Sequence, residues 1–265
     1  MTNKQSNLAI GFKDVDATNS SEVYADHLRF QYDLPFFKQY KAKTYELIAA
    51  MPGEKVLEIG CGLGFDAEVL ANAVDPEGSV YGIDSSADLI KAARERTKEM
   101  QLALEFCVMD AADLSFEDGF FDVCHIDRVL MHVEEPLNVL KEAMRVLKPG
   151  GRILCFEPDW GTLVINAKNS ATTKKYLDHW SQSLAAPWIG RQVSGYLQQL
   201  GITDLSITGE VCTLTDYATS NRMYCIEQNA KELVEKGIIT HDESKQWLDE
   251  LQSMSKNGEF FCSLT

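Results

Sequence analysis

The sequence predicts an α/β fold in which a mostly parallel sheet of seven strands carries helices on both faces. Three observations support this prediction. Short aliphatic and β-branched runs alternate with segments of helical spacing between residues 55 and 156, which is typical of parallel strands joined by right-handed helical crossovers. A glycine-rich turn lies between the first run and the helix after it. The 265 residues are enough for one such domain with additions.

An N-terminal part precedes the alternating strands and helices. Residues 1–19 are weakly patterned, and we expect them to form a flexible lead-in. A helix is predicted from Ser20, because a serine can cap it and apolar side chains follow at helical intervals. Pro35 interrupts this pattern, and a second helix is predicted over residues 36–51. Residues 20–51 are therefore interpreted as a pair of aromatic-rich lid helices.

The remaining elements follow in order along the chain. Strands are expected at about residues 55–59, 79–83, 104–109, 121–126, 152–156, 202–214 and 260–264. Helices are expected at about residues 66–74, 86–100, 136–147, 172–184, 191–200, 218–236 and 242–254. A ligand of such a sheet binds beyond the carboxyl ends of the parallel strands.

The pattern indicates one domain with an insertion rather than two domains. Residues 52–157 form the ligand-binding core of this interpretation. Residues 158–200 are a helical insertion after the fifth strand, and residues 201–265 complete the sheet and its helices. The sequence shows no internal repeat, low-complexity block or obvious linker that would separate a second domain.

Three glycines at alternate positions, Gly60, Gly62 and Gly64, follow the first predicted strand. Glycine permits a tight turn, lets the backbone approach a ligand and lets a helix pack closely on a strand. A strand, a glycine-rich turn and a helix in this order are the context of a nucleotide-binding loop. The sequence therefore predicts a nucleotide-like ligand at this turn.

The spacing of the loop distinguishes between ligands. A dinucleotide-binding loop has the pattern G-x-G-x-x-G, but Phe65 stands where its third glycine belongs. Glu58 lies two residues before the first glycine, and its carboxylate would repel a pyrophosphate but suit a cation. Both residues oppose a nicotinamide-dependent dehydrogenase, which is the rival from another enzyme class.

Charge and cysteine spacing exclude other classes of partner. The net charge is −15 and no cluster of Lys and Arg stands out, which argues against electrostatic capture of DNA, RNA or anionic lipid. The seven cysteines show no C-x-x-C pair and no Cys/His spacing of a zinc site. We find no H-E-x-x-H motif or carboxylate cluster either, so we expect no bound metal and no nucleic-acid partner.

Targeting signals are not recognisable in the sequence. The first twenty residues lack the basic start and apolar stretch of a secretory signal. No run approaches the 18 apolar residues of a membrane-spanning helix. We therefore expect a cytoplasmic protein without membrane insertion, as a monomer or a homodimer.

Five ordered motifs resemble those of the class I S-adenosylmethionine-dependent methyltransferases. They are VLEIGCGLG at 56–64, GIDSS at 82–86, DAADL at 110–114, FD at 121–122 and VLKPGG at 146–151. The likeness covers about residues 50–160 and is particularly to the enzymes of ubiquinone and menaquinone biosynthesis and to the small-molecule type 11 methyltransferases. It implies a Rossmann-like fold and S-adenosyl-L-methionine as the cofactor.

The resemblance implies specific cofactor contacts. The backbone from Gly60 to Gly64 would cradle the methionine part of the cofactor. Asp84 would accept hydrogen bonds from both ribose hydroxyls, since an ionised carboxylate has two acceptor oxygens. Asp110 and the backbone of Ala111 would contact the adenine. The alternative for Asp84 and Asp110 is a plain role as turn residues at strand ends.

Further residues are expected around the methionine end. Asp127 and Arg128 would line it, although a structural ion pair between them is an equal alternative. The full expected set of cofactor-binding residues is Tyr24, Tyr32, Glu58, Gly60, Cys61, Gly62, Gly64, Asp84, Ser85, Asp110, Ala111, Asp127 and Arg128.

Methyl transfer from a sulfonium is an in-line displacement, which requires alignment, desolvation and, for a weak nucleophile, removal of a proton. His132 and His27 are the candidate bases, and a structural role is the alternative for each. Aromatic walls suit both a flat acceptor and a sulfonium cation. The expected acceptor-binding residues are Phe36, Trp160, Trp188 and Arg191, with core packing as the alternative for Trp160.

We expect metal-independent methylation of a small organic acceptor on oxygen, nitrogen or carbon, as in biosynthetic or specialised metabolism. One alternative is a C-methyltransferase of a quinone precursor. An alternative from another class is a protein that binds S-adenosylmethionine without catalysis. The sequence leaves the acceptor open.

Overall fold

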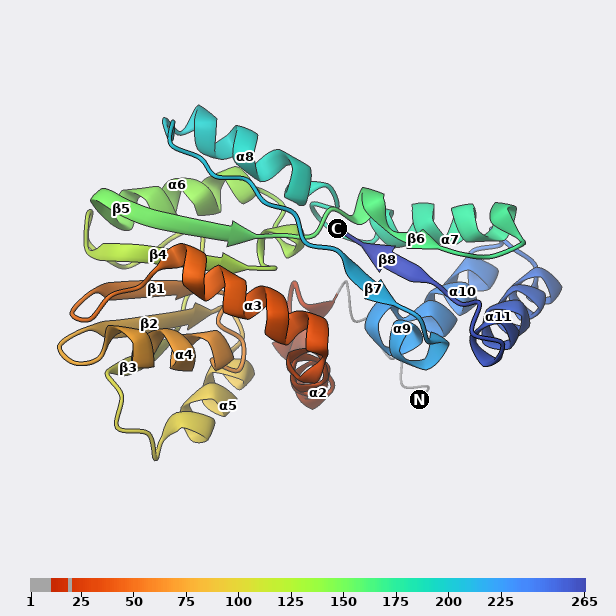
Figure 1. The fold of residues 1–265 in the computed structure, drawn as a ribbon, viewed down its shortest axis with the longest axis horizontal. Helices are drawn as coiled ribbons and strands as arrows, with labels where there is room; N and C mark the ends of the chain where they lie inside the picture. Colours follow the sequence, from red (N-terminus) through yellow and green to blue (C-terminus); the bar gives the residue numbers. More distant parts are fainter. Residues whose placement is uncertain (1–10, 19–20) are drawn as a thin grey trace.

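The computed structural model describes residues 11–18 and 21–265. Figure 1 shows two groups of elements side by side, a parallel sheet with its helices and a smaller group that contains the second, shorter sheet. No helix within the described residues is long and apolar enough to cross a bilayer. Ser20 and much of the expected lead-in over residues 1–19 lie outside the described residues.

The parallel sheet has five strands. They are β1 (Lys55–Ile59), β2 (Ser79–Asp84), β3 (Leu104–Val108), β4 (Phe121–Asp127) and β5 (Leu147–Phe156). Their order is β3-β2-β1-β4-β5, and every neighbouring pair is parallel. Because the strand order reverses between β1 and β4, the carboxyl ends of these two strands flank the crevice where such sheets bind ligands.

Helices cover both faces of this sheet, as the sequence predicted. One face packs Val56, Val80 and Val123 against α4 (Phe65–Val74), α5 (Ala87–Thr97) and the end of α3 (Pro35–Ile48). The opposite face packs Leu57, Cys124 and Ile126 against α6 (Pro136–Val146), and α8 (Ile189–Gln199) lies next to α6. Alternate strand residues thus reach opposite helical layers.

The N-terminal elements lie near the carboxyl ends of the strands. Helix α2 (Ser21–Asp33) packs on α3 and sits beside the arrowheads of the sheet in Figure 1. The short η1 (Asp16–Thr18) precedes it, and the Asp16 carboxylate accepts hydrogen bonds from Ser86 Oγ and from the backbone N–H of Ala87. Asp16, which lies within the expected lead-in, thus contacts the start of α5.

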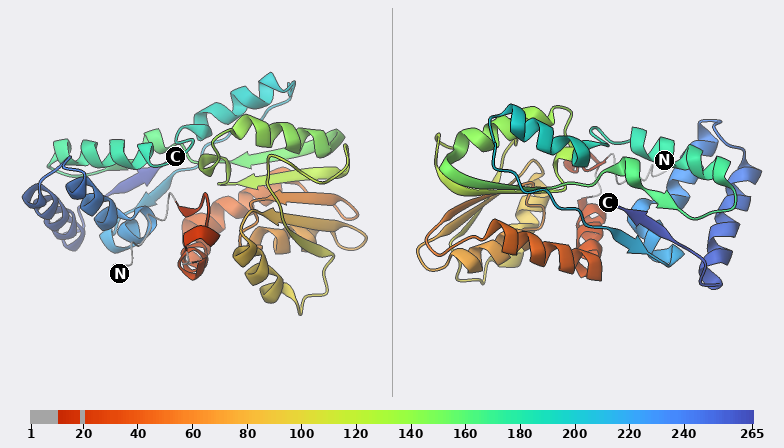
Figure 2. Two further views of the ribbon diagram at one scale, coloured as in Figure 1. Left: turned by 180° about the vertical axis from the view of Figure 1, so that it is seen from behind. Right: turned by 45° about the horizontal axis from the view of Figure 1, so that its top comes forward.

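The smaller group contains β6 (Val164–Ile165), β7 (Cys212–Leu214) and β8 (Cys262–Leu264). These strands are antiparallel in the order β6-β8-β7. The helices α7 (Ser170–Gln182), α9 (Tyr217–Tyr224), α10 (Ile226–Glu235) and α11 (His241–Lys256) pack with them (Figure 2). Of two 3-10 turns, η2 (Leu130–His132) follows β4 within the parallel-sheet group, and η3 (Trp160–Thr162) lies between β5 and β6, where the chain passes from one group to the other.

The prediction of one seven-stranded sheet is wrong for the described part of the chain. Of the predicted strand over 202–214, only residues 212–214 are extended and paired, and residues 262–264 pair with β6 and β7 rather than with β5. The reason is burial, because Ile165 and Cys262 turn inward onto the helices of the smaller group. Residues 202–211 pass β5 without strand pairing (Figure 1).

Candidate functional site

A large cavity lies at the carboxyl ends of the parallel strands, between the two groups of elements. Its volume is about 2050 Å³. Gly60, Asp84 and Asp110 line one end, and Trp160 and Met223 line the other. The hollow also continues along the outer edge of β5 below residues 202–210, which accounts for a volume larger than a nucleotide-like ligand with a small acceptor requires.

The glycine-rich loop after β1 exposes its backbone to this cavity. Gly60 has φ +70°, and a Cβ there would lie 2.3 Å from Cγ2 of Val129. Gly64 has φ +71° at the N-cap of α4, where a Cβ would lie 2.4 Å from Cζ of Phe106. Both positions combine a left-handed backbone with no room for a side chain. The loop can therefore cradle a ligand by backbone contact.

Carboxylates at the ends of β2 and β3 face the same end of the cavity. Oδ2 of Asp84 accepts a hydrogen bond from Gly62 N at 2.9 Å, and Oδ1 accepts one from Ser86 N at 2.9 Å. Burial raises the pKa of Asp84, and these N–H donors oppose that effect. Asp110 is exposed and accepts a hydrogen bond from Ala112 N at 2.8 Å. This end offers acceptor oxygens to hydroxyl and amine donors.

A buried ion pair network joins helix α3 to the loop region. The Lys41 ammonium contacts Asp66 on α4 and lies 2.8 Å from Oδ2 of Asp127 at the end of β4. Tyr40 donates a hydrogen bond to Oδ1 of Asp127 at 3.1 Å, and Tyr45 donates one to Asp66. Burial lowers the pKa of Lys41, but the two carboxylates outweigh it and hold that pKa well above its usual range. The ammonium is thus charged.

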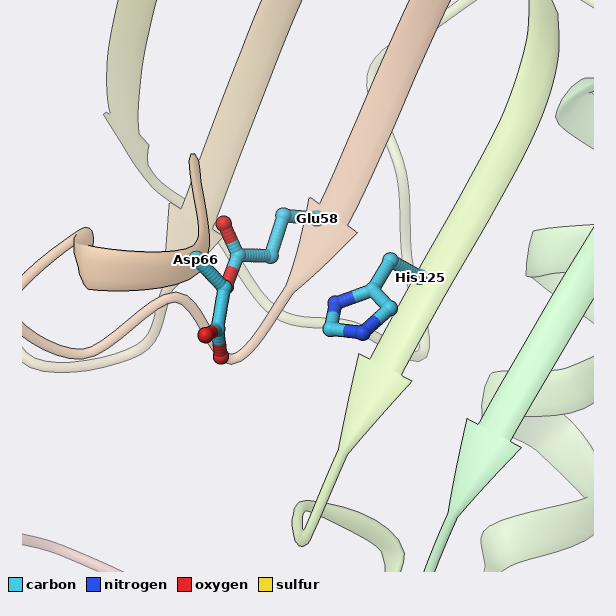
Figure 3. Close-up of side chains that lie close together, drawn as sticks. All are labelled: Glu58, Asp66 and His125. Atoms are coloured by element: carbon cyan, nitrogen blue, oxygen red, sulfur yellow. The ribbon is translucent and has the colours of Figure 1, made fainter. Parts of the chain in front are cut away.

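Glu58, Asp66 and His125 converge behind the loop, as Figure 3 shows. Their ligand-type atoms lie within 4.8 Å of one another. Glu58 Oε2 and both ring nitrogens of His125 have no hydrogen-bond partner among the described residues. Burial and the nearby Asp66 raise the pKa of Glu58 well above its usual range. Lys41 and Tyr45 already engage both oxygens of Asp66, so the ammonium supplies the positive charge of this cluster.

The candidate base His27 is buried on α2. Its Nε2 lies 2.7 Å from the side-chain nitrogen of Gln31. Burial lowers the pKa of His27 to about 3, with Arg128 and Arg222 adding to the effect. His27 is therefore neutral near pH 7 and a weak proton acceptor. His132, the second candidate, lies at the cavity with its ring centroid 5.3 Å from that of Phe12.

Aromatic side chains form the far end of the cavity. Trp160 packs edge-to-face on Trp180, with centroids 5.3 Å apart, and donates through Nε1 to the sulfur of Met131 at 3.3 Å. The Arg191 guanidinium pairs with Asp159, with Nη2 2.8 Å from Oδ1. Phe36 also lines the cavity. Trp160 is thus part of the packed core and of the cavity wall at once.

A buried carboxylate shapes the turn after β4. Glu157 accepts hydrogen bonds from the backbone N–H groups of Val129 at 2.8 Å, Leu130 at 2.7 Å and Met131 at 3.3 Å. Burial raises the pKa of Glu157 to about 8, and the N–H donors oppose this rise. Glu157 thereby positions the backbone that carries Arg128 and the turn with His132.

Most residues singled out in the sequence lie at one cavity. Those in its lining are His27, Phe36, Gly60, Gly62, Asp84, Ser85, Asp110, Ala111, Asp127, Arg128, His132, Trp160 and Arg191. Those outside the lining are Tyr24, Tyr32, Glu58, Cys61, Gly64 and Trp188.

The residues outside the lining lie in different environments. Tyr24 is fully buried and packs edge-to-face on Phe12 at 5.0 Å, while Tyr32 stacks on Phe65 at 4.2 Å. Glu58 was expected at the mouth of the site, but its side chain turns behind the glycine loop and is 3% exposed. Trp188 is 49% exposed, away from the cavity.

Gln31, Lys41 and Glu157 were missed by sequence reasoning. Gln31 and Lys41 occupy ordinary polar positions of amphipathic helices, which carry no motif. Glu157 directly follows the fifth strand, and its place at the carboxyl end of a parallel strand was a usable signal.

The sheet order, the glycine loop after β1 and the carboxylates at the ends of β2 and β3 define a nucleotide-binding enzyme of the Rossmann-like type. A family model described as a methyltransferase domain matches residues 50–250. The chain therefore belongs to this family of S-adenosylmethionine-dependent methyltransferases.

Curated relatives agree with this assignment. An uncharacterised 37.1 kDa protein in transposon Tn4556 of Streptomyces fradiae is 34% identical over 229 residues, which cover 86% of this chain and 65% of the relative. The demethylmenaquinone methyltransferase of Bacillus cytotoxicus is 36% identical over 128 residues, which cover 48% of this chain and 54% of the relative. The chain thus spans less than two thirds of the length of either relative.

Solved structures share the fold at low sequence identity. The YcgJ protein from Bacillus subtilis is similar with a TM-score of 0.56 and 15% identity, over 86% of this chain and 98% of that one. Phosphoethanolamine N-methyltransferase 2 of Haemonchus contortus, solved with S-adenosyl-L-methionine, has a TM-score of 0.56 and 19% identity, over 96% of this chain and 59% of that one. These likenesses concern the fold alone.

Proposed function

We propose that this chain transfers the methyl group of S-adenosylmethionine to a small organic acceptor, by a displacement that needs no metal ion. The observation that carries the proposal is the continuity of one cavity. It joins Asp84 and Asp110 at the strand ends to a chamber walled by Trp160, Trp180 and Met223. A cofactor at the first end and an acceptor at the second would therefore meet without passing through solvent.

The residues at the first end fit the cofactor. The left-handed Gly60, where Val129 leaves no room for a Cβ, supports a loop that contacts the cofactor through its backbone. Asp84 presents carboxylate oxygens that suit a pair of ribose hydroxyls, and Asp110 with Ala111 lies where an adenine would be read. When bound, S-adenosylmethionine supplies an electrophilic methyl group on a sulfonium.

The chain's own residues then position the reactants. The buried ion pairs of Lys41 fix Asp127 at the end of β4, beside the glycine loop. Trp160 and Trp180 are buried, and exclusion of water by these walls would strengthen electrostatic interactions inside the cavity. We propose His132 as the group to test for proton removal, since it lines the cavity and His27 is a weak base there.

The proposal also assigns a role to each part of the chain. Residues 52–157 would hold the cofactor, residues 20–51 would act as a lid and residues 158–200 would shape the acceptor pocket.

Relatives named demethylmenaquinone methyltransferases favour a quinone precursor as the first alternative acceptor. The acidic surface, with a net charge of −15, favours a small molecule over nucleic acid. We propose a cytoplasmic monomer or homodimer.

The test is incubation of the protein with methyl-labelled S-adenosylmethionine and a metabolite extract, followed by mass spectrometry of labelled products. The proposal is supported if a labelled small molecule forms with the active protein and not without it. The product should form equally in the presence and in the absence of EDTA. Binding of the cofactor without any labelled product would favour the non-catalytic alternative. Loss of product with EDTA and its return with magnesium would replace the metal-independent mechanism.

A further inference from the structure

The cavity contains one arginine whose charge is poorly compensated. Four of the cations that line the cavity have a close carboxylate partner: Lys13 with Glu134, Lys148 with Asp122, Arg152 with Glu54 and Arg191 with Asp159. Arg128 has a single carboxylate contact among the described residues, with Nε 3.7 Å from Oδ1 of Asp127. That carboxylate is already shared by Tyr40 and Lys41.

The backbone holds Arg128 in an unusual conformation. Its φ is +57°, a left-handed value that costs a non-glycine residue on the order of 1 kcal/mol or more. The cost is met by surrounding contacts, because Arg128 N donates to Phe156 O at 2.8 Å and Glu157 binds the next three N–H groups. Such strain is typically retained where the direction of a side chain matters.

The side chain of Arg128 points away from the glycine loop. Val129 is the residue that packs against Gly60. The Arg128 guanidinium instead lies 4.7 Å from the ring of Phe37 on α3, and its Nη2 donates to Oε1 of Gln31 on α2 at 2.5 Å. Gln31 in turn contacts the sulfur of Met223 on α9 at 3.6 Å. Arg128 thus points to the junction of the lid with the smaller group, at the acceptor end.

Gln31 is neutral, and its hydrogen bond leaves His27 neutral as well. Neither residue therefore compensates the charge of Arg128 or adds a second charge beside it. An arginine has only donors, so the oxygen of the Gln31 amide must face Arg128 and its nitrogen must face His27. The nitrogen then donates to Nε2 of His27, which fixes the unprotonated Nε2 and a neutral ring. Gln31 accepts from Arg128 without neutralising it.

Most donors of Arg128 therefore remain for a ligand. Of the five N–H groups of a guanidinium, one makes a hydrogen bond within the described part of the chain. The side chain is 17% exposed, and a partly desolvated guanidinium binds a planar oxyanion more strongly than one in bulk water.

We propose that Arg128 binds an anionic oxygen of the methyl acceptor, such as a carboxylate, a phenolate or an enolate. This inference rests on the proposed function and assigns the substrate class of the same site. The sequence had placed Arg128 with the cofactor, and the carboxylate of the cofactor is the rival source of the same chemistry. The experiment is designed to separate these two sources.

The probes are benzoate and its neutral isostere benzamide, titrated into the protein with S-adenosylhomocysteine bound and followed by ligand-observed NMR. We expect wild-type protein to prefer benzoate by about tenfold or more, since a charge-assisted pair is lost with benzamide. Arg128→Met should bring the two probes to within about twofold of each other. Gln31→Glu should do the same while keeping the arginine, because it supplies an internal carboxylate.

The control is Arg29→Met, which removes an exposed arginine of α2 that pairs with Glu22 and Asp26 on the surface. It should retain the preference for benzoate. Calorimetry with S-adenosylhomocysteine and with methylthioadenosine, which lacks the carboxylate, completes the test. An Arg128→Met protein that loses affinity for S-adenosylhomocysteine alone would assign the arginine to the cofactor and overturn the proposal.

Equal affinity of the wild-type protein for both probes, or no binding of either, would also overturn it. Failure of the wild-type protein to bind S-adenosylhomocysteine would instead contradict the proposed function. In that case the two probes are compared on the protein alone, and a preference for benzoate that Arg128→Met removes would still support an anion site.

Discussion

Asp84 holds the glycine loop and faces the cavity at the same time. Its two oxygens accept hydrogen bonds from the backbone of Gly62 and Ser86, and the residue lines the cofactor end. Loss of the carboxylate would therefore remove the hydrogen bonds that hold the loop, together with the ligand contact that we propose. The same reasoning does not hold for Asp110, whose carboxylate contacts the backbone of its own turn at Ala112.

We predict that Asp84→Ala weakens binding of S-adenosylhomocysteine by about tenfold to a hundredfold, because hydrogen bonds to an ionised acceptor contribute about 1.5 to 3 kcal/mol. Isothermal titration calorimetry measures this directly. Asp178→Ala is the control, since Asp178 pairs with Lys174 on the surface of α7. An unchanged affinity in Asp84→Ala would show that the ribose contact is wrongly assigned.

His27 provides a prediction on stability. Burial lowers its pKa from 6.5 to about 3 in the folded protein, so below pH 6.5 the unfolded chain binds one proton more. The contribution of neutral His27 to the free energy of unfolding is present above pH 6.5 and is lost as the pH falls towards 3. The expected slope is about 1.4 kcal/mol per pH unit, or roughly 2 kcal/mol between pH 6.5 and 5.

Urea unfolding at pH 7.5 and pH 5.0 tests this prediction. Other groups also titrate in this range, so the comparison is with His27→Gln, which has no ring to protonate. The wild-type protein should lose about 2 kcal/mol more than the variant over this interval. Equal losses would mean that His27 is protonated in the folded protein too.

The two N-terminal helices, α2 and α3, which we propose as a lid, differ in how they are fixed. Helix α3 is tied to the sheet by the buried ion pairs of Lys41 with Asp66 and Asp127. Helix α2 is joined to the end of β4 through the Gln31 to Arg128 hydrogen bond, and it packs on α3. A lid that responds to ligands is therefore expected to move mainly at α2.

We predict that S-adenosylhomocysteine raises hydrogen-exchange protection over residues 21–33 more than over residues 35–48, because ordering of a lid restricts local opening. Mass spectrometry of exchange in both states measures this. Deletion of residues 1–34 should remove turnover and leave the sheet folded, as judged by circular dichroism. Exchange indifferent to the ligand, together with activity of the truncated protein, would make these helices ordinary packing.

The strands of the parallel sheet could be predicted because the local sequence pattern indicates each of them. The strands β1 to β5 have at least five residues each. Apolar side chains make up more than half of each predicted run at 55–59, 79–83, 104–109, 121–126 and 152–156, and a turn or a motif follows each run. In the smaller group, the helices and extended segments around 212–214 and 262–264 were expected, but β6 and the pairing of these strands in a separate sheet were not. The reason is that β6, β7 and β8 have two or three residues each and pair across long separations, as Val164 does with Ser263. Such pairing depends on tertiary contacts that local pattern does not contain.

The residues of the candidate site were likewise predicted only in part. Asp84, Asp110 and Asp127 were expected at the site because of the motifs that resemble those of the methyltransferases, and each lies at or just after the carboxyl end of a parallel strand and lines the cavity. Lys41 and Gln31 were not, because only the packing of α2 and α3 brings these helical side chains to Asp127 and Arg128. A helix at Ala218–Lys236 was expected as one piece, but Cys225, at φ +51°, divides it into α9 and α10.

At the scale of the whole molecule, charge limits the range of partners. The net charge of −15 opposes capture of a polyanion. We predict no binding of a fluorescent 30-nucleotide DNA or RNA by anisotropy at low salt, where electrostatic binding is strongest. A basic protein in the same assay is the positive control. Binding that weakens steeply with salt would reveal a basic patch and contradict this prediction.

The strand order also has a consequence for biosynthesis. The parallel sheet is complete once residue 156 has been synthesised, whereas β6 and β7 are joined only by β8 at residues 262–264. At usual elongation rates the interval is roughly 5 to 20 s. During it, the cofactor end of the cavity can already be formed on the ribosome while the inner side chains of the smaller group lack their closing strand. A nascent chain stalled in this window would be a natural client for chaperones.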